Sequence, residues 1–299
     1  MASVTPPGAD YDVEVDLVGG VPHQVLKQAF GATGSSTLVS ETDPLPVTMP
    51  AATSTDYFVE VARGNVSGHS VVHVFGENPD IDAGQEDLWG GGGDYTGFNA
   101  TGAETVDVFS SDAADTSAGT GARTVMLYGL DASFAEQSET VTMNGTTHVV
   151  SVNSYIRLDR VKVLTAGSGG ENAGVLTVHQ TTTTAVVFAA VPIGFNHSLI
   201  AAHTVPAGKT GYFLDWFAEM AGGNNASSQC RLRMRPDGSV FQVMEIVALE
   251  DGGDTAIHRG YAAPKNTILE KADIVVSADA DTANTAVSGG YTLLLIDNP

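Results

Sequence analysis

The acidic segment from Asp80 to Asp87 is the part of the sequence whose side chains best match a metal-binding loop. Its carboxylates follow one another at short spacing, at Asp80, Asp82, Glu86 and Asp87. Clustered carboxylate oxygens are the ligands that calcium prefers. An EF-hand loop needs a bidentate glutamate at its twelfth position, which is Gly91 here. We therefore expect a solvated acidic loop, with a calcium site at these four carboxylates as the alternative.

The eight histidines show no spacing typical of a helical zinc site. His69 and His73 are four residues apart, but the residues between them are typical of a strand. Such spacing puts the two side chains on one face about 13 Å apart, too far to share an ion. Ser168 lies among glycines without the helix pattern that follows a nucleophile elbow. We expect structural or surface roles for these residues, no catalytic residue and no enzymatic activity.

Two glycine-rich segments, residues 90–93 and 119–121, could suggest phosphate-binding loops. Neither has the Lys-Ser/Thr pair of a P-loop, so we expect flexible turns. Trp89 and Trp216 are the two tryptophans, and we expect core anchors rather than platforms for sugar rings. The lone cysteine, Cys230, excludes an intrachain disulfide and is expected to be a buried apolar residue of a strand.

The net charge of −22 excludes several classes of partner. Such a surface repels a phosphate backbone, so we expect no nucleic-acid binding. The sequence has no apolar run as long as the roughly 18 residues of a membrane span, and we expect no membrane association. The first residues lack a basic start and an apolar run, so we expect no signal peptide and synthesis in the host cytoplasm.

The elements that would position these residues are predicted to be strands. The charged fraction is only 16%, and small and β-branched residues favour pleated sheet joined by tight turns. The many short strands predict an all-β, antiparallel β-sandwich of jelly-roll type. The predicted strands are residues 58–62, 70–75, 104–109, 124–128, 156–164, 175–179, 181–187, 198–204, 211–217, 273–278 and 291–296.

Two hairpins stand out. Asn144-Gly145 lies between two alternating segments, 139–143 and 146–150, and predicts a type I′ turn. Further on, Arg231, Arg233 and Arg235 alternate with apolar residues, and a Pro-Asp-Gly turn at 236–238 leads into an apolar strand over 240–249. The second hairpin is expected to have one apolar and one basic face.

The first 58 residues differ from the rest and are predicted to be an arm. A strand is expected over residues 11–18 and one or two helical turns over 21–30, followed by an extended, proline-rich path. The arm is expected to attach the chain to a neighbour, with residues 59–299 as the sandwich domain, in two sub-sheets if split near residue 190. The residues expected to make the attachment are Val21, Val25, Leu26, Phe30, Pro44, Leu45, Pro46 and Val47.

Several segments of the chain resemble virion structural proteins of tailed phages. The resemblance covers most of the chain loosely and is carried by turn and packing motifs in residues 31–47, 76–89, 110–122, 144–174 and 205–211. It implies a jelly-roll protein of the virus particle, either a capsid decoration protein or one associated with the tail or neck. It transfers no catalytic residue.

The sequence therefore favours a non-enzymatic structural protein located in the virion. Its expected partners are further copies of itself, as a homo-oligomer and specifically a homotrimer, and the major capsid or other virion proteins. Two alternatives stay open: a carbohydrate- or receptor-binding module for host adsorption, and a polysaccharide-degrading enzyme. Exposed aromatic residues beside carboxylates would favour either alternative.

Overall fold

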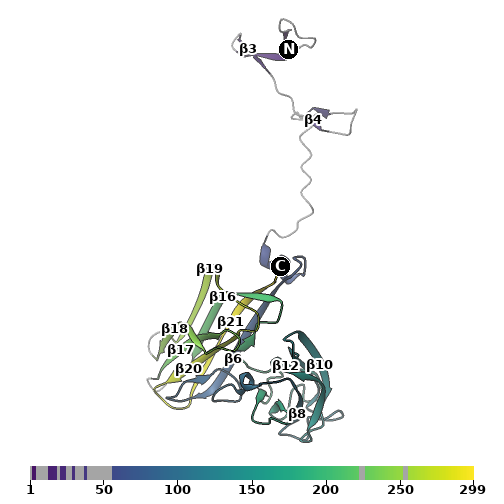
Figure 1. The fold of residues 1–299 in the computed structure, drawn as a ribbon, viewed down its shortest axis with the longest axis vertical. Helices are drawn as coiled ribbons and strands as arrows, with labels where there is room; N and C mark the ends of the chain where they lie inside the picture. The colour runs from purple at the N-terminus through teal and green to yellow at the C-terminus, as the bar shows by residue number, and fades with distance from the viewer. Residues whose placement is uncertain are drawn as a thin grey trace. The chain divides into compact units, whose positions relative to one another are not determined.

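The computed structural model describes residues 56–221, 226–251 and 255–299, together with five short strands within the first 55 residues (Figure 1). Side chains are described from residue 56 onward, except for residues 262–266. The chain divides into two units, Met1–Thr55 and Asp56–Pro299. The sequence predicts a boundary after residue 58.

The strands of the N-terminal unit form two small antiparallel sheets, β1-β2-β3 and β4-β5. Val18 at the end of β2 lies opposite Val21 at the start of β3, so two glycines connect these strands. The prediction of helical turns over residues 21–30 is wrong where the structure describes them, because β3 and β4 lie there. Of the attachment residues, Val21 and Phe30 lie in these strands, and the other six lie outside the described residues. The strands are β1 (Ala2–Val4), β2 (Val13–Val18), β3 (Val21–Gln24), β4 (Ala29–Phe30) and β5 (Thr37–Leu38).

The C-terminal unit begins with a short helix, α1 (Tyr57–Ala62), where the sequence predicts a strand over residues 58–62. The carboxylate of Asp56 explains the difference, because it caps the helix by accepting hydrogen bonds from the amides of Phe58 and Val59. Among the described residues, no helix has the length and apolar character needed to cross a membrane.

Two sheets of the C-terminal unit form a sandwich that we call the parent sandwich. One sheet has the order β19-β16-β21-β6 and the other β15-β20-β17-β18, with β7 also paired to β20. Their antiparallel strands are β6 (His69–Ile81), β7 (Glu86–Asp87), β15 (Ala202–Thr204), β16 (Lys209–Met220), β17 (Ser227–Arg235), β18 (Gln242–Glu250), β19 (Ala256–Ile268), β20 (Asp273–Ala280) and β21 (Thr285–Asp297).

A second sandwich is inserted between β7 and β15 of the first, and we call it the inserted sandwich (Figure 1). Its sheets have the orders β10-β9-β12 and β11-β8-β13-β14. A 3-10 turn, η1 (Thr96–Asn99), precedes its strands. These strands are β8 (Glu104–Ser110), β9 (Ala122–Leu130), β10 (Glu136–Thr142), β11 (Val149–Tyr155), β12 (Arg157–Ala166), β13 (Leu176–Gln180) and β14 (Val187–Val191).

Each sandwich has its own hydrophobic core. Trp216, Tyr291 and Phe213 are the largest side chains enclosed in the parent core, and Tyr155 and Phe188 in the inserted core. Alternating strand residues supply both cores, since successive side chains point to opposite faces. The structure confirms the all-β, antiparallel sandwich class, whereas its strand orders do not confirm the jelly-roll type.

The predicted hairpin at Asn144-Gly145 is wrong. Its first arm lies in β10, which pairs with β9, and its second lies in β11, which pairs with β8 of the opposite sheet. Gly145 has φ +61°, but Asn144 is not among the described residues with positive φ, as a type I′ turn requires. The Gly145 amide instead donates to the carbonyl of Asp115 at 2.7 Å, and its carbonyl accepts from the Ser110 amide at 2.9 Å. The turn therefore carries the chain from one sheet to the other.

The second predicted hairpin is confirmed, because β17 and β18 pair antiparallel across the turn at 236–238. Cys230 is fully buried in β17 as expected, and burial raises the pKa of its thiol to about 11. Residues 181–186, predicted as strand, form the connection between β13 and β14 instead. There the carboxylate of Glu104 accepts hydrogen bonds from the amides and hydroxyls of Thr182 and Thr183, which closes the turn.

Candidate metal centre

The four carboxylates of the predicted calcium loop have other hydrogen-bond partners or face solvent. Asp80 and Asp82 are exposed. Glu86 accepts from the Asn78 side-chain amide and from the Gly93 amide, both at 3.0 Å.

Asp87, the buried member of the loop, forms an ion pair with Arg233 and accepts from the Tyr95 amide at 2.9 Å. Burial raises the pKa of the Asp87 carboxyl, an effect that the Arg233 charge opposes. Among the described residues, the four carboxylates do not form a cluster with metal-ligand spacing. The structure therefore does not bring these four carboxylates together as a set of calcium ligands.

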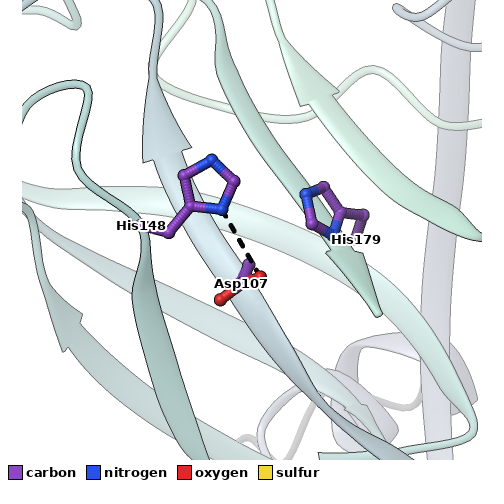
Figure 2. A group of neighbouring side chains, drawn as sticks. All are labelled: Asp107, His148 and His179. Carbon is purple, nitrogen blue, oxygen red and sulfur yellow. Dashed lines mark ion pairs between the residues drawn. The ribbon is translucent and has the colours of Figure 1, made fainter. Parts of the chain in front are cut away.

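A different group does have that spacing: Asp107, His148 and His179, for which one ligand atom from each lies within 4.8 Å of the others. Figure 2 shows the two imidazoles on either side of the Asp107 carboxylate, with His148 Nδ1 3.4 Å from Asp107 Oδ2. The sequence predicts structural or surface roles for the histidines and gives no indication of a role for Asp107. No spacing along the chain could have found the group, since its members are separated by 41 and 31 residues.

The strand register brings these three residues to one face of the sheet β11-β8-β13-β14 (Figure 2). Asp107 of β8 lies directly opposite His179 of β13. On the other side of β8, Asp107 lies opposite Val150 of β11, and His148 stands two residues before Val150 on the same face. The neighbouring Val106 and Val108 point the other way into the inserted core. The cluster is thus on the outer face of the inserted sandwich.

Aromatic contacts hold the two imidazoles in place. The His148 ring stacks on Phe109 with centroids 4.0 Å apart and planes 4° from parallel. His179 meets Phe109 and His148 edge-on, with centroids 5.5 Å apart in both pairs. Asp107 and His179 are only 9% and 8% exposed, so the carboxylate and one imidazole are largely removed from water. His148 is the member that faces solvent.

The glycine-rich segment at residues 119–121 packs against a buried carboxylate. The fully buried carboxylate of Asp115 accepts from the Ala122, Ala173 and Gly174 amides and from the Ser110 hydroxyl, at 2.6–2.8 Å. A Cβ on Gly121 would lie 2.1 Å from Asp115 Oδ1, so this loop needs glycine. Residues 119–121 do form a turn, in which the Gly119 amide donates to the Thr116 carbonyl at 2.8 Å and the Gly121 amide to the Ala114 carbonyl at 3.0 Å. Ser168 lies exposed in a nearby loop.

The basic face of β17 is matched by aspartates. Arg231, Arg233 and Arg235 pair with Asp279, Asp87 and Asp273 respectively. The register of β17 with β20 places Arg231 and Arg235 beside the strand that carries two of these aspartates. The arginines are thus neutralised inside the protein and do not offer a free basic surface.

A cavity of about 270 Å³ lies where the parent and inserted sandwiches meet. On its wall, Asp159 Oδ1 accepts from His203 Nδ1 at 2.9 Å, so the imidazole is oriented by a carboxylate. His203 Nε2 is enclosed and has no hydrogen-bond partner among the described residues. The residues described along the wall include no serine, threonine or cysteine that such an imidazole could activate. The lining residues are Val72, Val74, Tyr128, Glu136, Asp159, Arg160, Lys162, Ala202 and His203.

Both tryptophans are buried, as predicted. The indole Nε1 of Trp89 donates to the Gly93 carbonyl and that of Trp216 to the Glu245 carboxylate, each at 3.0 Å.

Comparisons with protein-family models, with curated proteins and with solved structures find no match to this chain.

Proposed function

We propose that this chain is a non-enzymatic structural component of a tailed-virus particle that assembles as a homo-oligomer, with a homotrimer as the expected state. Within the particle it would be a capsid decoration protein or a protein associated with the tail or neck. The observation that supports this most is the division of the chain into the units Met1–Thr55 and Asp56–Pro299. The second unit encloses two cores built from residues between Val74 and Leu295. In this proposal residues 1–55 serve as the attachment segment.

Two long edge strands of the parent sandwich offer additional pairing surfaces. Among the described strands, β18 pairs only with β17, and β19 pairs only with β16. Each is therefore the edge strand of its sheet. Val240, Val243 and Ile246 are exposed on or beside β18. An unpaired edge with apolar side chains tends to take up a further strand. A strand from residues 1–55 of a neighbouring copy, added there, would extend the sheet across the assembly.

Sugar recognition has less support. Aromatic platforms for sugar rings are the usual feature of such sites, and both tryptophans are buried here. The observation in its favour is Tyr128, an exposed aromatic residue that lines the 270 Å³ cavity together with the carboxylates of Glu136 and Asp159. The net charge of −22 suits a protein that stays soluble until a specific neighbour binds it.

Two measurements test the proposal. The mass of the full chain by light scattering should be that of an oligomer, and a chain lacking residues 1–55 should be a folded monomer. An antibody against residues 56–299 should label purified virus particles in electron micrographs. A monomeric full chain would contradict the assembly role, and unlabelled particles would contradict the virion location.

A further inference from the structure

We propose that Asp107, His148 and His179 bind one Zn²⁺ ion, which ties together the strands β11, β8 and β13. The site would have three protein ligands and one position open to water. This inference depends only on the inserted sandwich and does not rest on the proposed function.

The backbone already brings the three ligands together. Asp107 and His179 are register partners on adjacent strands, and His148 is placed by the pairing of Val150 with Asp107. Two adjacent strands, β8 and β13, thus place Asp107 and His179 on the same sheet face, and His148 joins them from the position just before β11 (Figure 2). A site built on paired strands is held more precisely than one built on loops.

The tautomer of His179 leaves the correct nitrogen free. His179 Nδ1 lies 2.8 Å from the carbonyl oxygen of Gln180, and a carbonyl oxygen only accepts. The ring hydrogen is therefore on Nδ1, and Nε2 carries the lone pair that a metal needs. A hydrogen bond from the second ring nitrogen to a backbone carbonyl is the usual support of a metal-bound histidine.

The separation of the ligand atoms fits a small ion. Zinc–ligand bonds of about 2.1 Å in a tetrahedral arrangement separate two ligand atoms by about 3.4 Å. His148 Nδ1 and Asp107 Oδ2 are 3.4 Å apart. The other separations are at most 4.8 Å, so zinc binding would draw these ligand atoms closer together, and the His148 ring would slide along the Phe109 ring on which it stacks.

The ligand types select the metal. Two imidazoles and one carboxylate suit zinc and its neighbours among the transition metals, whereas calcium and magnesium prefer all-oxygen sites. A simple ion pair would need only one imidazole, as in the exposed pair of His258 with Asp215. The second imidazole, His179, is buried beside the same carboxylate, and that distinguishes this cluster from an ion pair.

The test uses the full chain, freed of metal with EDTA and then desalted. Zinc chloride is titrated calorimetrically in competition with a chromophoric chelator, and Tm is measured with and without zinc. The variants are His148→Ala, His179→Gln and Asp107→Asn. His258→Ala is the matched control, because it removes a histidine from an aspartate pair that has no second imidazole. Cobalt chloride serves as a spectroscopic probe, since a low-coordinate Co²⁺ site absorbs visible light.

We expect the full chain to bind one zinc equivalent at this site and to have a higher Tm with zinc than without it. Each cluster variant should lose this zinc equivalent, with a zinc affinity lower by about 100-fold or more. Such a loss exceeds the roughly 10–100-fold effect of removing a residue that only supports a metal ligand. The control should bind like the unmodified chain. If His179→Gln or Asp107→Asn fails to fold, His148→Ala decides, because its side chain is half exposed. Unchanged zinc affinity in His148→Ala, or no zinc-dependent rise in Tm in the full chain, would overturn the proposal.

Discussion

Arg157 of the inserted sandwich and Asp273 of the parent sandwich form a buried, two-pronged ion pair. Arg157 Nε lies 3.1 Å from Asp273 Oδ1, and Arg157 Nη2 lies 3.2 Å from Asp273 Oδ2. The same carboxylate accepts from Arg235 and from the Thr204 hydroxyl. Asp273 of β20 is therefore bonded to three other strands, β12, β15 and β17. The pair joins two sandwiches with distinct core clusters, of which the inserted one also takes in Ala202 and Val275 from parent strands.

Replacing this carboxylate should therefore destabilise the protein strongly. We expect Asp273→Asn to lower the free energy of unfolding by about 3–5 kcal/mol, because it leaves two guanidinium groups buried without their counter-charge. Asp279→Asn is the control: it breaks the more exposed pair with Arg231 within one sandwich and should cost about 1 kcal/mol. Chemical denaturation measures both. Equal losses in the two variants would contradict the role assigned to Asp273.

The Asp115 carboxylate should behave as the anchor of the loops around it. Asp115→Asn replaces one acceptor oxygen by a donor, which leaves buried amide or hydroxyl donors unsatisfied at about 1–3 kcal/mol each. We expect a total loss of about 2–5 kcal/mol in the free energy of unfolding. In the control Asp112→Asn, the exposed side chain can still accept from the Ala114 amide, so stability should change little. A small loss in Asp115→Asn would show that the loops hold without this carboxylate.

Gly145 should not tolerate a larger residue. Its φ of +61° is unfavourable for a β-branched side chain, and a Cβ there would lie 3.1 Å from Ala113 Cα. We expect Gly145→Val to cost about 1–3 kcal/mol, visible as a lower Tm. Gly102→Val is the control, because that glycine has open space and no positive φ. Equal melting temperatures for the two variants would mean that the crossing between the sheets is not fixed at Gly145.

Glu104 should make stability depend on acid pH. Hydrogen bonds from the hydroxyls and amides of Thr182 and Thr183 lower the pKa of the Glu104 carboxyl to about 2. A depressed pKa stabilises the fold above the unfolded-state value near 4.5, and this stabilisation fades as the pH falls towards 2. The Tm advantage of the unmodified chain over Glu104→Gln should therefore be largest above pH 4.5 and should shrink between pH 4.5 and 2. A Tm difference that is constant across this range would contradict the assignment.

The sequence by itself determined the local features of the fold. Small and β-branched residues in period-2 patterns fixed the all-β class, because alternation decides which side chains face a core. The Pro-Asp-Gly turn at 236–238 and the pattern around Cys230 correctly predicted the β17–β18 hairpin. The burial of Trp89 and Trp216 followed from their scarcity and size. An exception is α1, where one capping aspartate, Asp56, outweighed the β-favouring residues after it.

Only the tertiary structure decided which strands are partners. Asn144-Gly145 has the local chemistry of a hairpin, but its backbone bonds to the loop of Asp115, and its flanking strands enter different sheets. The insertion of one sandwich into another joins Arg157 to Asp273 across 116 residues of sequence. Asp107, His148 and His179 meet for the same reason, since strand register is set by non-local pairing that alternation does not encode. Local pattern therefore specified the faces of the strands, and the packing of the whole chain specified the sites.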